Sequence, residues 1–223
     1  MMGVLAFVLL VLGWAVSVPV PGQYMVEKNG KMETKQCPVG HYCMGDGDKR
    51  ACPPGTYGKK TGLSSSSCSG ACEAGFYCPV GSVSSRQISC PLDTKSYCPE
   101  RSGIPSPVGL GYYAVENHAN IGGGFGAEKG CTQGYYCIDG MRSPCPAGRY
   151  GNIMLEVNAS CTGACEAGWY CPKASTSKYE RSCGDPGLYC PRESAEPKTV
   201  AIGYYSVGTL EDPNQVGEDM DNY

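Results

Sequence analysis

The cysteines of this chain fall into two sets of eight with almost the same spacing. Successive cysteines lie 6, 9, 16, 4, 6, 12 and 8 residues apart in the first set, and 6, 8, 16, 4, 6, 12 and 7 residues apart in the second. The two sets are Cys37, Cys43, Cys52, Cys68, Cys72, Cys78, Cys90 and Cys98, then Cys131, Cys137, Cys145, Cys161, Cys165, Cys171, Cys183 and Cys190. This pattern predicts two copies of one cysteine-rich unit, at residues 37–98 and 131–190.

The residues between the cysteines repeat as well. Residues 65–79 and 158–172 are identical at 11 of 15 positions. Within each unit the phrase Cys-x-x-Gly-x-Tyr-Cys occurs twice, and each occurrence begins a group of four cysteines; the four copies are residues 37–43, 72–78, 131–137 and 165–171. We therefore expect four small modules, each large enough for two disulfides. The tyrosines that keep a fixed spacing to a cysteine are interpreted as packing on the disulfides; they are Tyr42, Tyr57, Tyr77, Tyr97, Tyr136, Tyr150, Tyr170 and Tyr189.

The composition explains why a chain of this kind needs so many cysteines. Only 26 of the 206 residues from Val18 onward are Leu, Ile, Val or Phe, which is too few for an ordinary buried core. Cysteine cross-links supply the missing constraint. We predict a small disulfide-rich fold, an elongated tandem array of cysteine-rich modules with short β-ribbons and little helix. The net charge of −3 excludes a basic nucleic-acid binder, and the poor core excludes a large α/β enzyme.

The amino terminus indicates the compartment. The apolar run from Val4 to Val16 is too short to span a bilayer and is typical of a signal peptide, residues 1–17, cut after Ser17. We therefore expect a secreted, extracellular or cell-surface protein whose 16 cysteines form disulfides. No membrane span is expected in the rest of this chain.

The remaining segments complete the predicted organisation. Residues 18–36 form an N-terminal segment, and residues 99–130 a linker whose glycine-rich part, Asn117 to Gly130, is predicted to be flexible. Residues 191–223 are interpreted as the start of a truncated third unit with an acidic tail, because Gly-Tyr-Tyr-Ser-Val at 203–207 matches Gly-Tyr-Tyr-Ala-Val at 111–115.

The residues that could form a metal or catalytic site do not fit the pattern of a known site. Zinc sites favour closely spaced Cys pairs with histidine nearby, whereas His41 and His118 occupy unrelated positions. A calcium loop beginning at Asp212 lacks its fifth ligand and its terminal glutamate. The carboxylates of Asp46 and Asp48 are interpreted as a turn. We expect no catalytic residues, no metal site and no cofactor.

One sequon for N-linked glycosylation is present, Asn158-Ala159-Ser160. The aligned residues of the first unit are Ser65-Ser66-Ser67, which lack the asparagine. We predict Asn158 as a glycosylation site, so that a glycan would shield one face of the second unit only.

The segments CPPGTYG (52–58) and CPAGRYG (145–151), with the cysteine-rich stretches at 63–82 and 161–172, resemble the ephrin-receptor-like, growth-factor-receptor-type cysteine-rich repeats. These are distantly similar to the tumour-necrosis-factor-receptor modules. The resemblance implies elongated, disulfide-laddered rods used for adhesion, spacing or partner binding. It also implies pairing of first with third and second with fourth cysteine: Cys37–Cys52, Cys43–Cys68, Cys72–Cys90 and Cys78–Cys98, then Cys131–Cys145, Cys137–Cys161, Cys165–Cys183 and Cys171–Cys190.

These observations lead to one functional hypothesis and two alternatives. We expect a non-enzymatic extracellular repeat protein that acts as a structural or adhesive rod, or as a protein-interaction module, in a matrix, coat or surface filament. Its partners would be other proteins or like chains, not nucleic acid. The leading alternative is the ligand-binding ectodomain fragment of a cell-surface receptor, and the third hypothesis is a small secreted inhibitor or effector.

Overall fold

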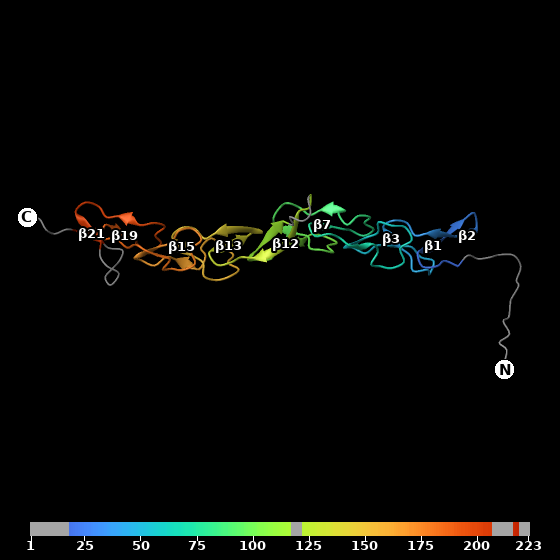
Figure 1. The fold of residues 1–223 in the computed structure, drawn as a ribbon, viewed down its shortest axis with the longest axis horizontal. Helices are drawn as coiled ribbons and strands as arrows, with labels where there is room; N and C mark the ends of the chain where they lie inside the picture. The colour runs from blue at the N-terminus through green and yellow to red at the C-terminus, as the bar shows by residue number, and fades with distance from the viewer. Residues whose placement is uncertain (1–17, 117–121, 207–215, 219–223) are drawn as a thin grey trace, which may run out of the picture.

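The computed structural model describes residues 18–116, 122–206 and 216–218. The predicted signal peptide and most of the predicted acidic tail lie outside these residues. The described chain forms a long, narrow rod, with β1 (Gln23–Lys28) and β2 (Lys31–Gln36) at one end and β21 (Tyr204–Ser206) and β22 (Val216–Glu218) at the other (Figure 1). The elements between them follow one another along the rod in chain order.

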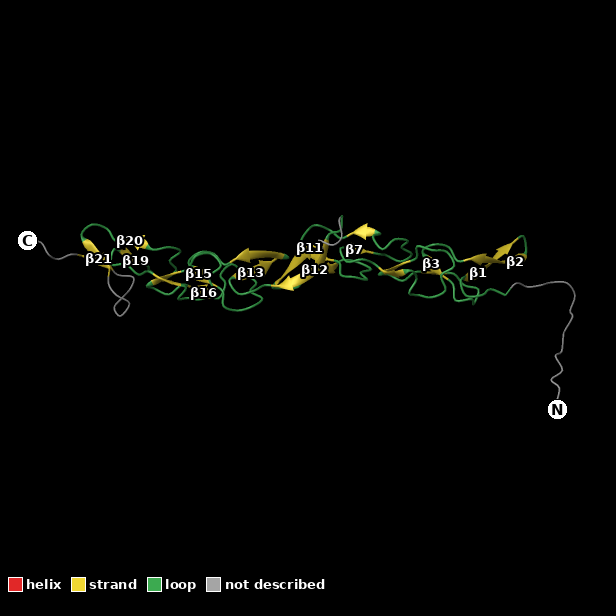
Figure 2. Cartoon of the chain, viewed as in Figure 1, coloured by secondary structure: helices red, strands yellow, loops and turns green. Residues whose placement is uncertain are grey.

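The described residues contain eleven two-stranded antiparallel sheets and no helix (Figure 2). Besides β1–β2 and β21–β22 they are β3 (His41–Tyr42) with β4 (Arg50–Ala51), β5 (Thr56–Tyr57) with β6 (Gly70–Ala71), β7 (Phe76–Tyr77) with β8 (Ile88–Ser89), β9 (Ser96–Tyr97) with β10 (Ser106–Pro107), β11 (Tyr112–Glu116) with β12 (Phe125–Gly130), β13 (Tyr135–Ile138) with β14 (Met141–Pro144), β15 (Arg149–Tyr150) with β16 (Gly163–Ala164), β17 (Trp169–Tyr170) with β18 (Arg181–Ser182), and β19 (Leu188–Tyr189) with β20 (Lys198–Thr199). The predicted disulfide-rich fold with short ribbons and little helix is confirmed.

Local sequence explains why these ribbons are so short. In the Cys-x-x-Gly-x-Tyr-Cys phrase at residues 37–43 a turn precedes the strand, with the amide of His41 bonded to the carbonyl of Pro38 at 3.2 Å. A Cys-Pro-x-x-Ser turn follows several of the strands; after β7 the Ser82 hydroxyl donates to the carbonyl of Pro79 at 2.7 Å. Because turns recur every few residues, each hairpin keeps only a few residues in extended pairing.

Successive hairpins stack through the backbone at the turn glycines. The amide of Gly40, before β3, donates to the carbonyl of Gly58 in the next hairpin at 2.8 Å. Gly40 also lies against the β7–β8 hairpin, because a methyl group on Gly40 would be 2.5 Å from the carbonyl oxygen of Gly81. Gly134 faces the carbonyl of Ala174 in the same way in the second unit. Each such hairpin therefore contacts the next two along the rod.

This approach of a glycine to a carbonyl recurs along the chain. The further pairs are Gly22 with Gly62, Gly55 with Arg101, Gly75 with Gly124, Gly111 with Leu155, and Gly148 with Glu193. Every one joins a hairpin to the hairpin two places ahead. The rod is thus a stack in which contacts stay between near neighbours, as in other repeat proteins.

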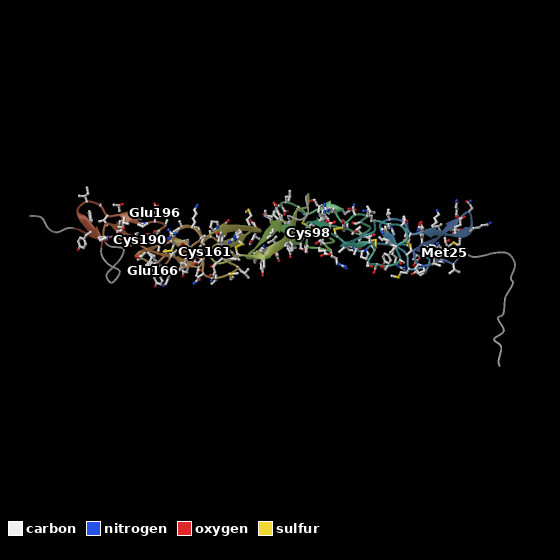
Figure 3. The ribbon with its side chains drawn as sticks, in the orientation of Figure 1. Met25, Cys98, Cys161, Glu166, Cys190 and Glu196 are labelled. Atoms are coloured by element: carbon white, nitrogen blue, oxygen red, sulfur yellow. A yellow bond between two sulfur atoms is a disulfide. The ribbon has the colours of Figure 1, made fainter. Side chains whose placement is uncertain are left out.

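The interior of the rod consists of cystine. Apart from cysteine, the buried hydrophobic side chains of the described residues are Tyr42 and Phe76. The larger aliphatic side chains lie outside, with Leu110 89% exposed and Leu92 71% exposed. Figure 3 shows side chains projecting along the whole rod, with the labelled Cys98, Cys161 and Cys190 spread from its middle toward one end. Cystine replaces the aliphatic core that the sequence lacks.

All 16 cysteines are paired, but the pairing implied by the resemblance is wrong. In each group of four the first cysteine bonds to the second and the third to the fourth: Cys37–Cys43, Cys52–Cys68, Cys72–Cys78, Cys90–Cys98, Cys131–Cys137, Cys145–Cys161, Cys165–Cys171 and Cys183–Cys190. The physical reason is the turn inside the phrase, which brings the Cα atoms of Cys37 and Cys43 to 5.9 Å, within the usual range for a disulfide. The repeating element is therefore one hairpin rather than a module of two crossed disulfides.

The segment between the two units is not the flexible linker that its glycines predict. Its described residues form β10, β11 and β12, and the amide of Gly124 bonds to the carbonyl of Gly75 in the first unit at 3.0 Å. A methyl group on Gly124 would clash with the carbonyl oxygen of Cys90. These glycines allow close backbone packing. Residues 117–121, within the predicted flexible stretch, lie outside the described residues.

The stacking contact predicts unequal effects for two glycine substitutions. Gly134 and Gly30 both have positive φ, +79° and +72°, so alanine at either position adds about 1 kcal/mol of backbone strain. Gly134→Ala also forces the Ala174 carbonyl away, whereas no atom lies within 4 Å of a methyl group on Gly30. We expect Gly134→Ala to lower the free energy of unfolding by about 1–3 kcal/mol more than Gly30→Ala, measured by denaturant unfolding of the oxidised chains. Equal losses would contradict the stacking contact.

Neighbour pairing predicts a simple peptide map. After trypsin digestion without reduction, residues 36–49 form one peptide that contains both Cys37 and Cys43, and residues 130–142 form another that contains Cys131 and Cys137. Each should be recovered alone, two hydrogen atoms lighter than its reduced form, by mass spectrometry. Recovery of residues 36–49 joined to residues 51–59 would instead demonstrate a Cys37–Cys52 bond and overturn the pairing.

Candidate functional site at the junction of the two units

The predicted carboxylate turn is held by one arginine. Asp46 and Asp48 lie between β3 and β4, and both contact Arg50, at 2.7 Å and 3.3 Å. The hydrogen bond from Arg50 is the main cause that lowers the pKa of Asp46. The amide of Asp48 also donates to the Asp46 carboxylate at 3.1 Å, which closes the turn. The pair of carboxylates therefore acts on its own loop.

The other candidate chemistry is dispersed. Nδ1 of His41 lies 3.1 Å from the carbonyl oxygen of Val39, two residues away, and His118 lies outside the described residues. Within residues 18–116, 122–206 and 216–218, no three His, Cys, Asp or Glu side chains gather in a way that could hold a metal ion. The calcium-like segment from Asp212 falls almost wholly on residues the structure does not describe.

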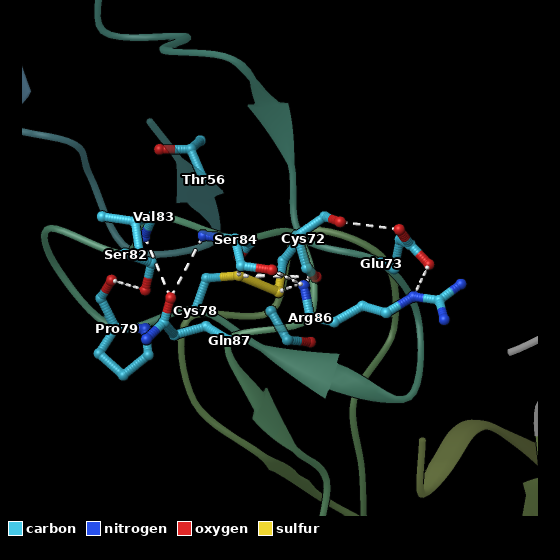
Figure 4. Close-up of a disulfide and its surroundings, with 12 residues drawn as sticks. Thr56, Cys72, Glu73, Cys78, Pro79, Ser82, Val83, Ser84, Arg86 and Gln87 are labelled. Carbon is cyan, nitrogen blue, oxygen red and sulfur yellow. Dashed lines mark hydrogen bonds and ion pairs between the residues drawn. A yellow bond between two sulfur atoms is a disulfide. The ribbon is translucent and has the colours of Figure 1, made fainter. Parts of the chain in front are cut away.

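Polar side chains beside the disulfides hold loops in place. Glu73, next to Cys72, accepts hydrogen bonds from the Ser85 hydroxyl and from Nε of Arg86, both at 2.7 Å (Figure 4). The Ser85 bond, then the Arg86 bond, lower the pKa of Glu73. A lowered pKa means that this stabilisation is complete at neutral pH and fades only as the pH falls below the ordinary value of 4.5.

The second unit uses the same arrangement with different partners. Glu166 beside Cys165 contacts Nζ of Lys178 at 3.4 Å, and the Glu180 carboxylate accepts from the amides of Thr176 and Ser177 at 3.1 Å. In the first unit the Gln87 side chain takes the place of Glu180 (Figure 4). These exposed contacts order the loop that covers a cystine.

The junction between the units is built around Glu128 on β12. Its carboxylate accepts a hydrogen bond from the Tyr97 hydroxyl at 3.2 Å and another from the amide of Gly109 at 2.8 Å. Tyr97 belongs to the last hairpin of the first unit and Gly109 to the segment before β11. One carboxylate therefore joins three parts of the junction. Burial is the main cause that raises the pKa of Tyr97, and the negative charge of Glu128 raises it further.

A second set of contacts joins the first unit directly to the β13–β14 hairpin. The Thr94 hydroxyl donates to the carbonyl of Asp139 at 3.0 Å, and Nζ of Lys95 lies 3.7 Å from the Asp139 carboxylate. Gly140, at the tip of the hairpin, lies against the carbonyl of Thr94. The two units are thus fixed to each other by side-chain and backbone contacts.

The junction also forms a pocket of about 310 Å³ that opens to solvent. Its lining includes the apolar side chains of Val108, Leu110, Ile138 and Val157 and the charged side chains of Lys95 and Asp139. Ile138 and Val157 are 51% and 42% exposed, so apolar surface faces water here. A pocket with apolar and charged side chains in its lining suits an apolar side chain of a partner protein.

A cation stacked on tyrosine flanks the same hairpin. The guanidinium of Arg142 on β14 lies 3.5 Å from the ring centre of Tyr135 and 5.8 Å from that of Tyr113. In the first unit Lys49 lies over Tyr24 at 5.4 Å. Since the contact recurs at aligned positions, Tyr24 and Tyr113 each hold a basic side chain of their own rod.

The predicted glycosylation site lies beside the pocket. Residues 157–160 are exposed, and Asn158 directly follows the pocket residue Val157. The side-chain oxygen of Asn158 accepts hydrogen bonds from the amide and the hydroxyl of Ser160, with the amide bond 2.9 Å long. Sequence reasoning found this asparagine but missed both Glu128 and the pocket, because their partners are far apart in the chain and no motif marks them.

Comparison with known proteins adds no further assignment. Neither a scan against protein-family models nor a search of curated proteins finds a match to this chain. Among the residues described by the structure, no helix is long and apolar enough to cross a membrane.

The role of Glu128 can be tested by substitution. We expect Glu128→Ala to lower the stability of the junction by about 1–3 kcal/mol, because it leaves the Tyr97 hydroxyl and the Gly109 amide without their acceptor. Hydrogen exchange at the Gly109 amide should accelerate accordingly. Glu33→Ala, which removes an exposed carboxylate from β2, is the matched control and should leave that exchange rate unchanged. An unchanged rate in Glu128→Ala would show that other contacts hold the junction.

Proposed function

We propose that this chain is a non-enzymatic extracellular rod that spaces or joins other proteins, or like chains, in a matrix, coat or surface filament. The observation that carries the proposal is the stacking of each hairpin on the next two through backbone contacts such as Gly40 with Gly81 and Gly134 with Ala174. A stack of this kind resists bending at every step.

The disulfides support an extracellular setting. Sixteen cysteines form eight bonds, and such a density of cystine persists in oxidising compartments. The bonds are also local, with sequence separations of 6 to 16 residues. Eight of the eleven described hairpins are thus closed by a disulfide of their own, and a rod of many hairpins does not depend on one central core.

The surface supports a role in contacts between proteins. Because cystine fills the interior, large apolar side chains are displayed singly along the rod, among them Val80 at 63%, Leu92 at 71% and Ile104 at 74% exposure. The two units also repeat the same hairpins and turns. A surface that repeats along a rod suits several weak contacts in series better than a single ligand site.

We infer a relationship to the ephrin-receptor-like and growth-factor-receptor-type repeats from the Cys-Pro-x-Gly-x-Tyr openings at residues 52–57 and 145–150. The neighbour pairing of the cysteines departs from the pairing that this resemblance implied. The shared feature is therefore the use of cystine and short turns to build an elongated module, which fits adhesion and spacing.

The proposal is tested by shape and location together. Small-angle X-ray scattering of the oxidised, secreted chain should give a rod-like particle, and fractionation of the producing cells should place the protein in the insoluble matrix, coat or filament fraction. Release from that fraction by a disulfide reductant is expected, since reduction dissolves the cystine core.

Three results would contradict the proposal. A compact scattering profile would show that the particle is not a rod. A protein found wholly as a free monomer in the culture medium would favour a secreted inhibitor or effector. Recovery with the plasma membrane as part of a longer polypeptide would favour the receptor ectodomain instead. Gly134→Ala serves as the control for shape, because it disturbs one stacking contact without removing a cysteine.

A further inference from the structure

We propose that Asn158 carries an N-linked oligosaccharide that stands over the apolar pocket at the junction of the two units. The inference rests on the secretory route of the proposed function but not on the role of the rod. It joins a modification site to a surface that the sequence did not reveal.

The loop presents the asparagine in a fixed and open conformation. Residues 157–160 are all exposed. The carbonyl of Asn158 accepts a hydrogen bond from the amide of Cys161 at 3.1 Å, and its side-chain oxygen accepts from Ser160. This is an Asx-type turn, in which the side-chain oxygen is engaged by the backbone two residues ahead. The side-chain nitrogen Nδ2 is the atom to which a sugar is attached.

The first unit contains the same loop without the asparagine. The amide of Cys68 donates to the carbonyl of Ser65 at 3.0 Å, and the hydroxyls of Ser65 and Ser67 lie 2.6 Å apart. Cys68 and Cys161 also share a positive φ, 52° and 47°. The two loops therefore share this turn, and only the loop of the second unit carries a sequon.

The surroundings of the two loops differ in polarity. Val157, before Asn158, forms part of the pocket wall with Leu110 and Ile138. The residue aligned with Val157 in the first unit is Ser64, which is polar and exposed. A glycan on Asn158 is thus placed beside exposed apolar surface, where it would keep water-soluble rods from associating through this pocket.

The attachment requires one covalent step. A bond forms between Nδ2 of Asn158 and the anomeric carbon of the first sugar, and Nδ2 loses a proton. The bond between that carbon and the diphosphate of a lipid-linked oligosaccharide breaks, and the lipid diphosphate leaves. The donor and the transferase belong to the secretory pathway.

The site is tested on the full chain secreted by a eukaryotic host and recovered from the medium. We expect a peptide N-glycosidase to remove one glycan and to convert Asn158 to aspartate, as seen by mass spectrometry. Asn158→Gln and Ser160→Ala should each lose the glycan. Ser65→Asn, which creates a sequon in the matching loop of the first unit, should gain a second glycan.

These outcomes test the glycosylation of Asn158 separately from the secretory route on which it rests. Wild-type protein recovered without a glycan overturns the site, and does so most sharply if Ser65→Asn is modified at its new sequon. A chain retained inside the cells, and found neither in the medium nor in the insoluble extracellular fraction, overturns the secretory premise and the proposed function together.

Binding of an apolar dye tests whether the glycan covers the pocket. Asn158→Gln and Ser160→Ala should bind an apolar fluorescent dye more strongly than the glycosylated protein, and adding Leu110→Ser to either variant should remove that gain. Equal dye binding with and without the glycan would show that the sugar does not cover the pocket.

Discussion

The structure depends on one local constraint, the disulfide that closes a turn between neighbouring cysteines. Cys37 and Cys43 meet because the turn at Pro38 returns the chain upon itself. Closing a loop of 6 residues contributes about 2 kcal/mol in the chain-entropy model, and a loop of 16 residues about 3 kcal/mol. These contributions are modest, but each closes a hairpin whose strands are only two to four residues long. Local closure therefore substitutes for a shared apolar core.

Stacking converts these closed turns into a rod. A glycine such as Gly134 lets the backbone of the hairpin two places ahead approach to contact, and the next hairpin bonds to its amide. Stability is then distributed along the chain, so damage at one hairpin affects its neighbours rather than the whole molecule. Because cystine fills the interior, the aliphatic side chains lie on the surface, where they can contact other proteins.

The junction is the place where the two units cease to be equivalent. Glu128 accepts hydrogen bonds from Tyr97 and Gly109 at the junction. Val157 and Leu110 line the pocket there, whereas the residue of the first unit that aligns with Val157 is the polar Ser64. The single sequon lies at this point as well. A rod of otherwise similar hairpins thus acquires one distinct surface, and the proposed glycan decides whether that surface is accessible.

The sequence by itself determined the cysteine count, the repeat and the absence of an aliphatic core, and these were sufficient to predict an elongated disulfide-rich fold with short ribbons. It also identified Asn158 and the structural role of Asp46. The tertiary structure decided which cysteines pair, because spacing leaves several connectivities open and only the turn at Pro38 brings Cys37 to Cys43. It decided likewise that the glycine-rich segment packs as part of the rod. Glu128 and the pocket emerge only in three dimensions, since residues 19 to 31 positions apart meet there without a motif.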